Sequence, residues 1–160
     1  MNVRIDPITS EDRDWVLEIV RGWGADFIIS RGRKLYAVEL EGFIARDESG
    51  ERVGLVTYQI IEDECEITTL DAFKRFAGIG TKLIETVIDR SKEIGAKRLW
   101  LITTNDNVDA IRFYHKRGFV IVAIHIDAIK KSRELKPSIP LIGYYGIPIR
   151  DEIEFEMMLG

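Results

Sequence analysis

The chain has 160 residues, of which 46% are apolar and 31% are charged, and its formal net charge is −4. This length predicts a single domain over residues 1–160, with a core large enough to fold without disulfides or a structural metal. The acidic balance, 27 Asp and Glu against 23 Lys and Arg, argues against binding to nucleic acid, and the single cysteine excludes internal disulfides and zinc sites built on paired cysteines.

The first part of the chain is predicted to hold short strands and one helix. The helix begins within Thr9 to Asp12, where acidic residues occupy the first turn, and it ends near Gly22 or Gly24. Residues 25–41 show no clear period, and a second short helix is one interpretation of them. The predicted strands of this part are residues 3–5, 42–47, 52–61 and 64–71.

The apolar pattern changes to a helical period after residue 78. Apolar residues recur at helical spacing over residues 79–94, and Gly95 follows as a natural C-terminal stop. The remaining predicted elements are a strand at 99–102, a helix at 108–116, a strand at 119–126, a helix at 127–135, a long ordered loop at 137–148 and a strand at 152–157.

The last of these strands has a regular alternation of residue types. Ile153, Phe155 and Met157 alternate with three glutamates, so we expect one buried face and one acidic face in water. The strand could also pair with a neighbouring copy of the chain, which suggests a homodimer.

The order of the elements predicts the fold class. Strands come first, and a strand–helix–strand–helix–strand series follows them. This order is typical of a mixed α/β fold, with helices on both faces of the sheet near its middle.

The sequence shows no feature of a membrane protein. Its longest apolar run, residues 119–124, is far shorter than the roughly 20 residues that span a bilayer, and its first residues lack the apolar core of a signal peptide. We therefore expect a cytoplasmic protein. Asn and Gln together number only four, which fits selection for heat resistance or ordinary compositional drift.

Residues 70–82 join a predicted strand to a predicted helix and contain Gly78 and Gly80. A helix N-terminus carries partial positive charge and unpaired N–H groups, and glycines allow the backbone to approach a phosphate closely. Arg75 and the Thr81 hydroxyl could add contacts to the same anion. The alternative is that the two glycines only permit a tight turn.

Two common phosphate motifs do not fit this loop. A P-loop ends in Gly-Lys-Ser/Thr, whereas Gly80 is followed by Thr81 and Lys82 in the opposite order. A dinucleotide fingerprint requires a third glycine at the position that Leu83 occupies. The loop therefore does not predict an ATP or NAD site.

Two segments resemble the signatures of GNAT-type N-acetyltransferases. Residues 75–80 resemble the Arg/Gln-x-x-Gly-x-Gly/Ala motif, and residues 107–119 resemble the Asn-x-x-Ala-x-x-Phe-Tyr-x-x-x-Gly-Phe segment. The resemblance implies a mostly antiparallel sheet with a central, splayed pair of parallel strands. It also implies acetyl-CoA as the cofactor and transfer of its acetyl group to an amine.

The resemblance further implies roles for individual residues. The pyrophosphate would bind the amides of residues 76–81, the Leu70 N–H would polarise the thioester carbonyl, and the Asn107 side chain would contact the cofactor. Tyr114 would protonate the departing thiolate, unless it is only a core aromatic residue. The cofactor contacts implied are Leu70, Arg75, Phe76, Ala77, Gly78, Ile79, Gly80, Thr81, Asn107 and Tyr114.

The acceptor side is less well defined by the sequence. Glu66 is the candidate base, with Glu64 on the same strand face, although either could be a solvated strand residue. Asp71 and Asp106 could bind a cationic acceptor or serve as turn and capping residues. No metal site is predicted.

The acceptor itself is expected to be an amine of a small molecule or peptide. Its pocket would be built from residues 22–41 and 137–149, with Trp23 as a candidate lining residue. Since Glu66 is the only proposal for a base, a non-catalytic acyl-CoA-binding module on the same fold is the alternative function.

Overall fold

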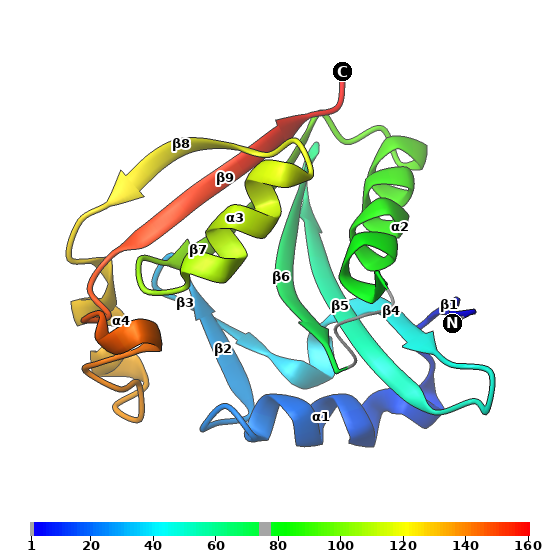
Figure 1. Ribbon diagram of the computed structural model, residues 1–160, viewed down its shortest axis with the longest axis horizontal. Helices are drawn as coiled ribbons and strands as arrows, with labels where there is room; N and C mark the ends of the chain where they lie inside the picture. The colour runs from blue at the N-terminus through cyan, green and yellow to red at the C-terminus, as the bar shows by residue number, and fades with distance from the viewer. Residues whose placement is uncertain (1, 74–77) are drawn as a thin grey trace. The chain divides into compact units, whose positions relative to one another are not determined.

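A computed structural model describes residues 2–73 and 78–160 of the chain (Figure 1). Internal contacts group these residues into two compact units. The first unit comprises Met1–Val16, Val38–Leu99 and Met158–Gly160, and the second comprises Leu17–Ala37 and Trp100–Met157. The single domain expected over residues 1–160 stays a prediction.

The first unit is built on an antiparallel ladder of four strands. Their hydrogen-bonded order is β1 (Arg4–Pro7), β4 (Glu41–Arg46), β5 (Arg52–Ile61) and β6 (Glu64–Ala72). The strand β7 (Arg98–Thr104) begins in this unit next to β6, where Arg98 Nη1 lies 3.0 Å from Glu64 Oε1. β6 and β7 form the parallel pair of an otherwise mostly antiparallel arrangement, which confirms the predicted mixed α/β class.

The helix α2 (Ile79–Glu93) packs an apolar face against these strands. Ile79, Leu83 and Ile84 are fully buried, as their helical spacing predicts. Gly54 of β5 allows this close approach, because a Cβ at that position would lie 2.6 Å from the Ile79 Cγ2 atom. The packing fixes the place where α2 begins.

The entry to the first helix is held by the buried carboxylate of Asp12. A 3-10 turn (Ser10–Asp12) leads into α1 (Arg13–Arg21), and the Thr9 N–H donates to Asp12 Oδ2 over 2.9 Å. Asp12 Oδ1 also accepts from Arg46 at 2.7 Å and Arg52 at 3.0 Å. Burial by itself would raise the pKa of Asp12, but the hydrogen bonds from Thr9 and Arg52 and the charge of Arg46 hold it below its ordinary value.

We expect Asp12→Asn to lower the free energy of unfolding by about 3 kcal/mol at pH 7, because it removes the charge that two partly buried guanidinium groups share. Since the folded-state pKa is lowered, this stabilisation is present above the unfolded pKa of about 4 and is lost as the pH falls through the folded value. Urea denaturation at pH 7 and pH 3 measures both. Asp6→Asn, which breaks the exposed pair with Arg4, is the control and should cost less than about 0.5 kcal/mol. Equal losses in the two variants would contradict the role of Asp12.

The second unit contains the rest of β7 together with β9 (Glu152–Met158) and β8 (Val120–His125). The hydrogen-bonded order is β7-β9-β8, and β8 runs antiparallel to β9. The helices α3 (Val108–Lys116) and α4 (Ala128–Leu135) lie where the sequence predicts them. A 3-10 turn (Tyr144–Gly146) lies within the predicted loop at 137–148.

The prediction of a second short helix within residues 25–41 is wrong. Most of this stretch is a hairpin of β2 (Phe27–Ser30) and β3 (Arg33–Tyr36), and only Ala37–Glu39 forms a 3-10 turn. Arg31 and Gly32 both have positive φ, 51° and 73°. This is the two-residue hairpin turn whose twist matches that of the flanking strands, and the glycine is its sequence signal.

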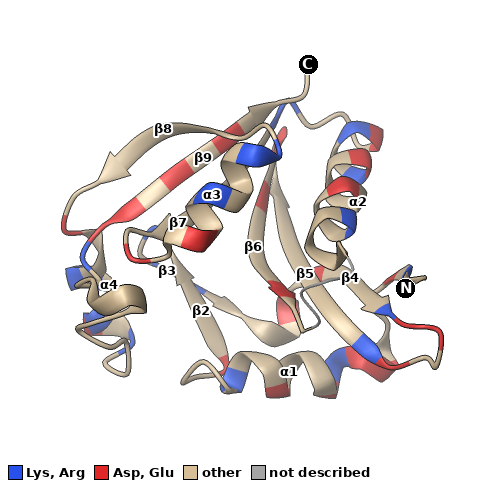
Figure 2. Cartoon of the chain, viewed as in Figure 1, with Lys and Arg blue, Asp and Glu red and all other residues tan. Residues whose placement is uncertain are grey.

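Two expectations for the last strand are also corrected. β9 lies between β7 and β8, so β8 forms the edge of the ladder and β9 has no open side for a neighbouring copy. The glutamates of β9 are the red segments of this strand in Figure 2. They are not all in water, because Glu152 is buried and pairs with Arg31 at 2.8 Å. The homodimer stays a prediction. No helix among the described residues combines the length and the apolar character needed to cross a bilayer.

Candidate active site

The strand β6 carries a β-bulge in its middle. Ile67 lies opposite Tyr58 and Thr69 lies opposite Thr57, so Thr68 is an extra residue without a partner position on β5. The Thr57 hydroxyl lies 2.7 Å from that of Thr68 and 2.6 Å from that of Thr69. Bulges bend a strand and change the direction of its groups, and they occur often beside active sites. Sequence reasoning missed this bulge, because it follows from the register between β5 and β6 and not from the sequence of β6 alone.

The bulge and the ladder pattern determine where the Leu70 N–H points. The Phe73 N–H donates to the Val53 carbonyl over 2.9 Å, so these residues form a hydrogen-bonded pair of the β5–β6 ladder. In an antiparallel ladder such pairs alternate along the strand, which makes Leu70 and Val56 a non-hydrogen-bonded pair. The Leu70 N–H therefore points to the edge of β6 that faces away from β5.

The two glutamates of β6 have different surroundings. Glu66 is only 2% exposed, and Gln59 Nε2 on β5 donates to its Oε1 over 2.9 Å. Glu64 is half-buried and forms the ion pair with Arg98. Of the two, Glu66 is therefore the carboxylate that the protein holds in a fixed position away from bulk water.

Asp71 lies near the end of β6 and is half-buried. Burial raises the pKa of this carboxyl above its ordinary value, although a hydrogen bond from the Ala72 backbone acts in the opposite direction. The charged form of Asp71 is thus less favoured than in a solvated turn. A cation bound beside it would offset that cost.

The start of α2 fits an anion. Its N-cap, Gly78, has a φ of 65° and supplies no side-chain oxygen, and the first turn contains no acidic residue. A Cβ on Gly78 would meet no atom within 4 Å, so the approach to it is open on the described side. Gly80 and Thr81 belong to the first turn, where helix N–H groups attract negative charge. Arg75, Phe76 and Ala77 lie outside the described residues.

In the second unit, Asn107 caps α3. Its Oδ1 accepts from the Ala110 N–H over 3.3 Å, which fixes the side chain at the start of the helix. With the oxygen engaged in this cap, the amide NH2 group is the part of the side chain suited to a ligand acceptor.

Tyr114 lies on the buried face of α3 within an aromatic cluster. It is 8% exposed, and its ring centroid lies 5.4 Å from that of Phe113 and 5.7 Å from those of Phe119 and Phe155. Burial raises the pKa of its hydroxyl well above the ordinary value, so the group keeps its proton at neutral and mildly basic pH. No hydrogen bond joins this hydroxyl to another of the described residues.

Asp106 holds the loop that contains Gly143 and Tyr144. Its Oδ2 accepts from the Tyr144 N–H over 3.1 Å, and a side chain at Gly143 would collide with the same carboxylate. The residue is 2% exposed, and its Oδ1 has no hydrogen-bond partner within the described part of the chain. Oδ2 of Asp106 therefore serves to hold the loop, whereas Oδ1 can still accept a hydrogen bond from a ligand.

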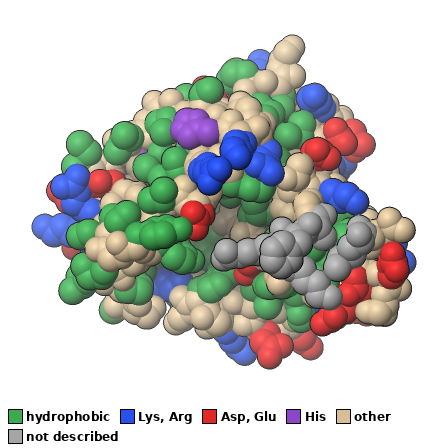
Figure 3. Space-filling view, in the orientation of Figure 1, with side chains coloured by type: hydrophobic (Ala, Val, Ile, Leu, Met, Phe, Trp, Pro, Cys, Tyr) green, Lys and Arg blue, Asp and Glu red, His purple; other side chains and the backbone are tan. Residues whose placement is uncertain are grey.

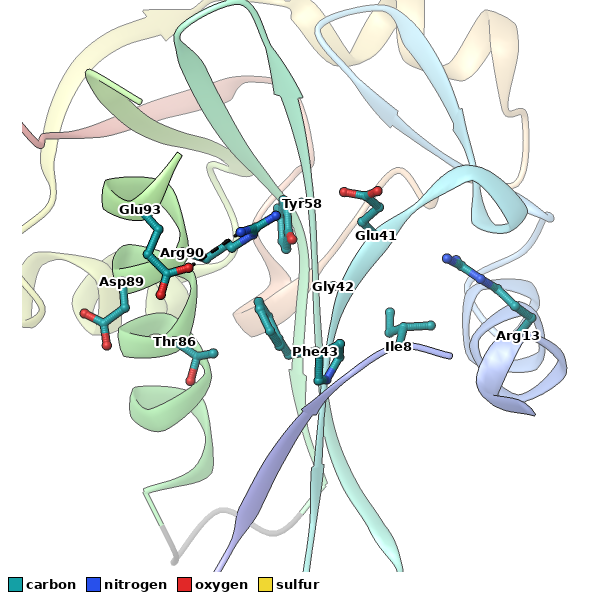
Figure 4. Close-up of a pocket in the computed structure, with 11 residues that line it drawn as sticks. Ile8, Arg13, Glu41, Gly42, Phe43, Tyr58, Thr86, Asp89, Arg90 and Glu93 are labelled. Carbon is teal, nitrogen blue, oxygen red and sulfur yellow. Dashed lines mark ion pairs between the residues drawn. The ribbon is translucent and has the colours of Figure 1, made fainter. Parts of the chain in front are cut away.

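The first unit contains a cavity of about 610 Å³ between α2, β4 and β5, and Figure 4 shows its lining. Arg90 of α2 extends toward Tyr58 and forms an ion pair with Glu93 at 3.5 Å. The described lining of this cavity includes none of the predicted site residues. The lining charges are mixed, with Arg13 and Arg90 set against three acidic residues, so the cavity favours no single charge of ligand.

A second cavity, of about 250 Å³, lies in the second unit. Trp23, Ile28 and Ile29 line it from the stretch 22–41, and Ile139 and Ile149 line it from the stretch 137–149. Both stretches that the sequence assigned to an acceptor pocket thus contribute to one cavity. Figure 3 shows that basic side chains gather elsewhere on this unit, over α3.

Residues 13–119 match the family model of the Acetyltransferase (GNAT) family. The chain belongs to the GNAT acetyltransferase family. The uncharacterized protein YdhI of Bacillus subtilis (strain 168) is 48% identical to this GNAT chain over 121 residues, which are 76% of each protein.

Solved GNAT structures share the fold. A GNAT family acetyltransferase from Elizabethkingia anophelis with acetyl-CoA bound superposes with a TM-score of 0.75 at 23% identity, over 99% of each chain. A Bacillus subtilis acetyltransferase in complex with CoA gives a TM-score of 0.71 at 21% identity, over 99% of this chain and 100% of that one. These likenesses confirm the predicted fold, and the family model together with the similarity to YdhI confirms the predicted family.

Proposed function

We propose that this GNAT protein transfers an acetyl group from acetyl-CoA to an amine of a small-molecule or peptide acceptor by direct attack, and that it works in the cytoplasm. The observation that carries the proposal is the start of α2, where a glycine N-cap with no side-chain cap leads into a first turn without acidic residues. Such a helix start suits a diphosphate. The relatives solved with acetyl-CoA or CoA support the choice of cofactor.

The residues that would hold the cofactor belong to three elements. The first turn of α2, with Gly78, Ile79, Gly80 and Thr81, would bind the pyrophosphate through backbone N–H groups, together with Arg75, Phe76 and Ala77. The Asn107 amide would contact the cofactor from the start of α3. Acetyl-CoA, when bound, supplies an acetyl group activated as a thioester.

The Leu70 N–H would stabilise the negative charge that grows on the acetyl carbonyl oxygen during attack. Its direction, away from β5, supports this role. One donor of this kind contributes roughly 3–4 kcal/mol to transition-state stability when it is positioned in advance.

Two side chains would move protons. Tyr114 would donate its phenolic proton to the leaving thiolate, and its raised pKa supports a group that is protonated when the reaction begins. Glu66 would accept the proton of the acceptor ammonium through a water, because an ammonium with a pKa near 10.4 is not a nucleophile. Asp71 and Asp106 would attract a cationic acceptor.

One observation favours the alternative of a non-catalytic acyl-CoA-binding module. The carboxylate of Glu66 is buried and already hydrogen-bonded to Gln59, so the candidate base is engaged within the protein. Detection of an acetylated acceptor by mass spectrometry separates this alternative from catalysis.

We expect acetyl-CoA and CoA to bind with submillimolar dissociation constants in isothermal titration. Mass spectrometry of the protein with acetyl-CoA and a panel of amines, peptides and aminoglycosides should then show an acceptor heavier by one acetyl group. Binding without acetylation of any amine would favour the binding module. Absence of binding at millimolar coenzyme would overturn the proposed function.

A further inference from the structure

The 250 Å³ cavity of the second unit has an apolar wall and one buried basic group. Its wall is formed largely by isoleucines of β2, β7, α4 and the loop after α4, together with Trp23. Lys136, directly after α4, also lines it. The cavity is smaller than the roughly 300–1,000 Å³ of sites for drug-sized ligands, so it suits a molecule of amino-acid size.

Lys136 is a mostly buried lysine whose ammonium has no counterion among the described residues. The residue is only 9% exposed, and no ion pair or hydrogen bond joins its side chain to any of the described residues. Burial lowers its pKa, because the charged form loses hydration and gains no partner. Lysines are rarely buried without a partner, so a ligand is the natural source of the missing negative charge.

The other charged group at the cavity does not supply that negative charge. Glu152 lines the cavity, but its Oε1 pairs with Arg31 Nη1 at 2.8 Å, and its Oε2 accepts from the Arg31 N–H at 3.3 Å. Arg31 lies in the turn of the β2–β3 hairpin and has a left-handed backbone conformation. Its backbone N–H and its guanidinium both contact the carboxylate of Glu152. Glu152 and Arg31 neutralise each other, which leaves the charge of Lys136 unbalanced.

We propose that this cavity is the acceptor pocket, that the acceptor is a small apolar amine carrying a carboxylate, and that Lys136 binds the carboxylate. The part of this proposal that concerns acetylation of the bound amine rests on the proposed function. The part that concerns carboxylate binding by Lys136 rests on the cavity alone. The isoleucine side chains lower the local dielectric constant, which strengthens an ion pair at Lys136, and they can accommodate a branched aliphatic side chain. An apolar amino acid has all three required features.

The first test uses two probes that lack an amine, so that binding is measured apart from acetyl transfer. 4-Methylpentanoate and the neutral 4-methylpentanamide have nearly the same shape and differ in charge. Isothermal titration of the full-length protein should show the carboxylate binding at least tenfold more tightly than the amide. Equal affinities, or no binding of the carboxylate at ~10 mM, would overturn the proposal without the need for any variant.

The second test assigns the preference to Lys136. Lys136→Met should reduce the preference for the carboxylate to less than twofold, since it keeps the length of the side chain and removes the charge. Lys130→Met, an exposed lysine of α4, is the matched control and should keep the full preference. A carboxylate preference that survives in Lys136→Met would place the anion elsewhere and overturn the role of Lys136.

A third test connects the pocket to catalysis. L-Leucine should be acetylated with a kcat/KM at least tenfold above that of L-leucinamide, and Lys136→Met should remove this difference mainly through KM. If the carboxylate probe binds through Lys136 but no amine is acetylated, the proposed function fails and the anion site stands. If both amines are acetylated equally well by the wild type and by Lys136→Met, the acetyltransferase stands and this inference fails.

Discussion

Gly80→Glu is expected to weaken the binding of CoA and acetyl-CoA by at least ~100-fold. Gly80 is the second residue of α2, in a first turn that contains no acidic side chain. A glutamate there would bring a negative charge and three extra side-chain carbon atoms to the N–H groups proposed for the diphosphate. Like charges brought together at an interface cost several kcal/mol, and each 1.4 kcal/mol is a tenfold loss of affinity.

Folding should survive the change, which makes the result interpretable. Acidic side chains stabilise the first turn of a helix, so Gly80→Glu is not expected to lower the melting temperature. Thr86→Glu adds the same charge to the same helix about 9 Å further along and is the matched control. Gly80→Ala separates bulk from charge. CoA affinity within threefold of the wild type in Gly80→Glu would remove the start of α2 from the cofactor site.

Elements with a strong local pattern were predicted well from the sequence. α3 occupies Val108–Lys116 as expected, and α2 differs from its prediction by one residue at its end. Each helix has apolar residues at helical spacing and a glycine or asparagine at its boundary. Both features lie within one short segment, so the local sequence is enough to predict the helix. The same holds for β5, which has its predicted bounds.

Features that depend on distant partners were not predicted. Glu152 belongs to an alternating strand pattern, and its burial follows from Arg31, 121 positions earlier in the chain. The hairpin that carries Arg31 was itself missed, because Phe27–Ser30 and Arg33–Tyr36 are each only four residues long. A strand of that length shows too few alternations to define a period.

The candidate site also contains features that a local motif predicts and features that depend on distant parts of the chain. The start of α2 and the capping Asn107 could be placed from motifs, because each motif lies within one segment. The bulge at Thr68 and the isolation of Lys136 arise from register and packing, which one segment does not encode. The two stretches predicted for an acceptor pocket, 22–41 and 137–149, supply part of the lining of the 250 Å³ cavity, but the rest of the lining, Lys136 included, comes from other elements.

Tyr114→Phe is expected to lower kcat by ~10² while the dissociation constant for acetyl-CoA stays within about threefold of the wild type. The reason lies in the leaving group. A thiol with a pKa near 8.5 leaves as a thiolate, and a proton donated as the carbon–sulfur bond breaks removes the cost of forming that charge in a site of low dielectric constant. Phenylalanine has the same ring and lacks only the proton donor. Stopped-flow or steady-state kinetics with an identified acceptor measures kcat, and isothermal titration measures binding.

Stability provides the internal check on this interpretation. The Tyr114 hydroxyl has no hydrogen bond to another described residue, whereas its ring packs against Phe113, Phe119 and Phe155. Phenylalanine preserves that packing, so Tyr114→Phe should change the free energy of unfolding by less than about 1 kcal/mol. Tyr144→Phe removes the hydroxyl of an exposed tyrosine in the same unit and should leave kcat unchanged. A stable Tyr114→Phe protein with the turnover of the wild type would assign Tyr114 to the core alone, and the thiolate would then leave without help from this side chain.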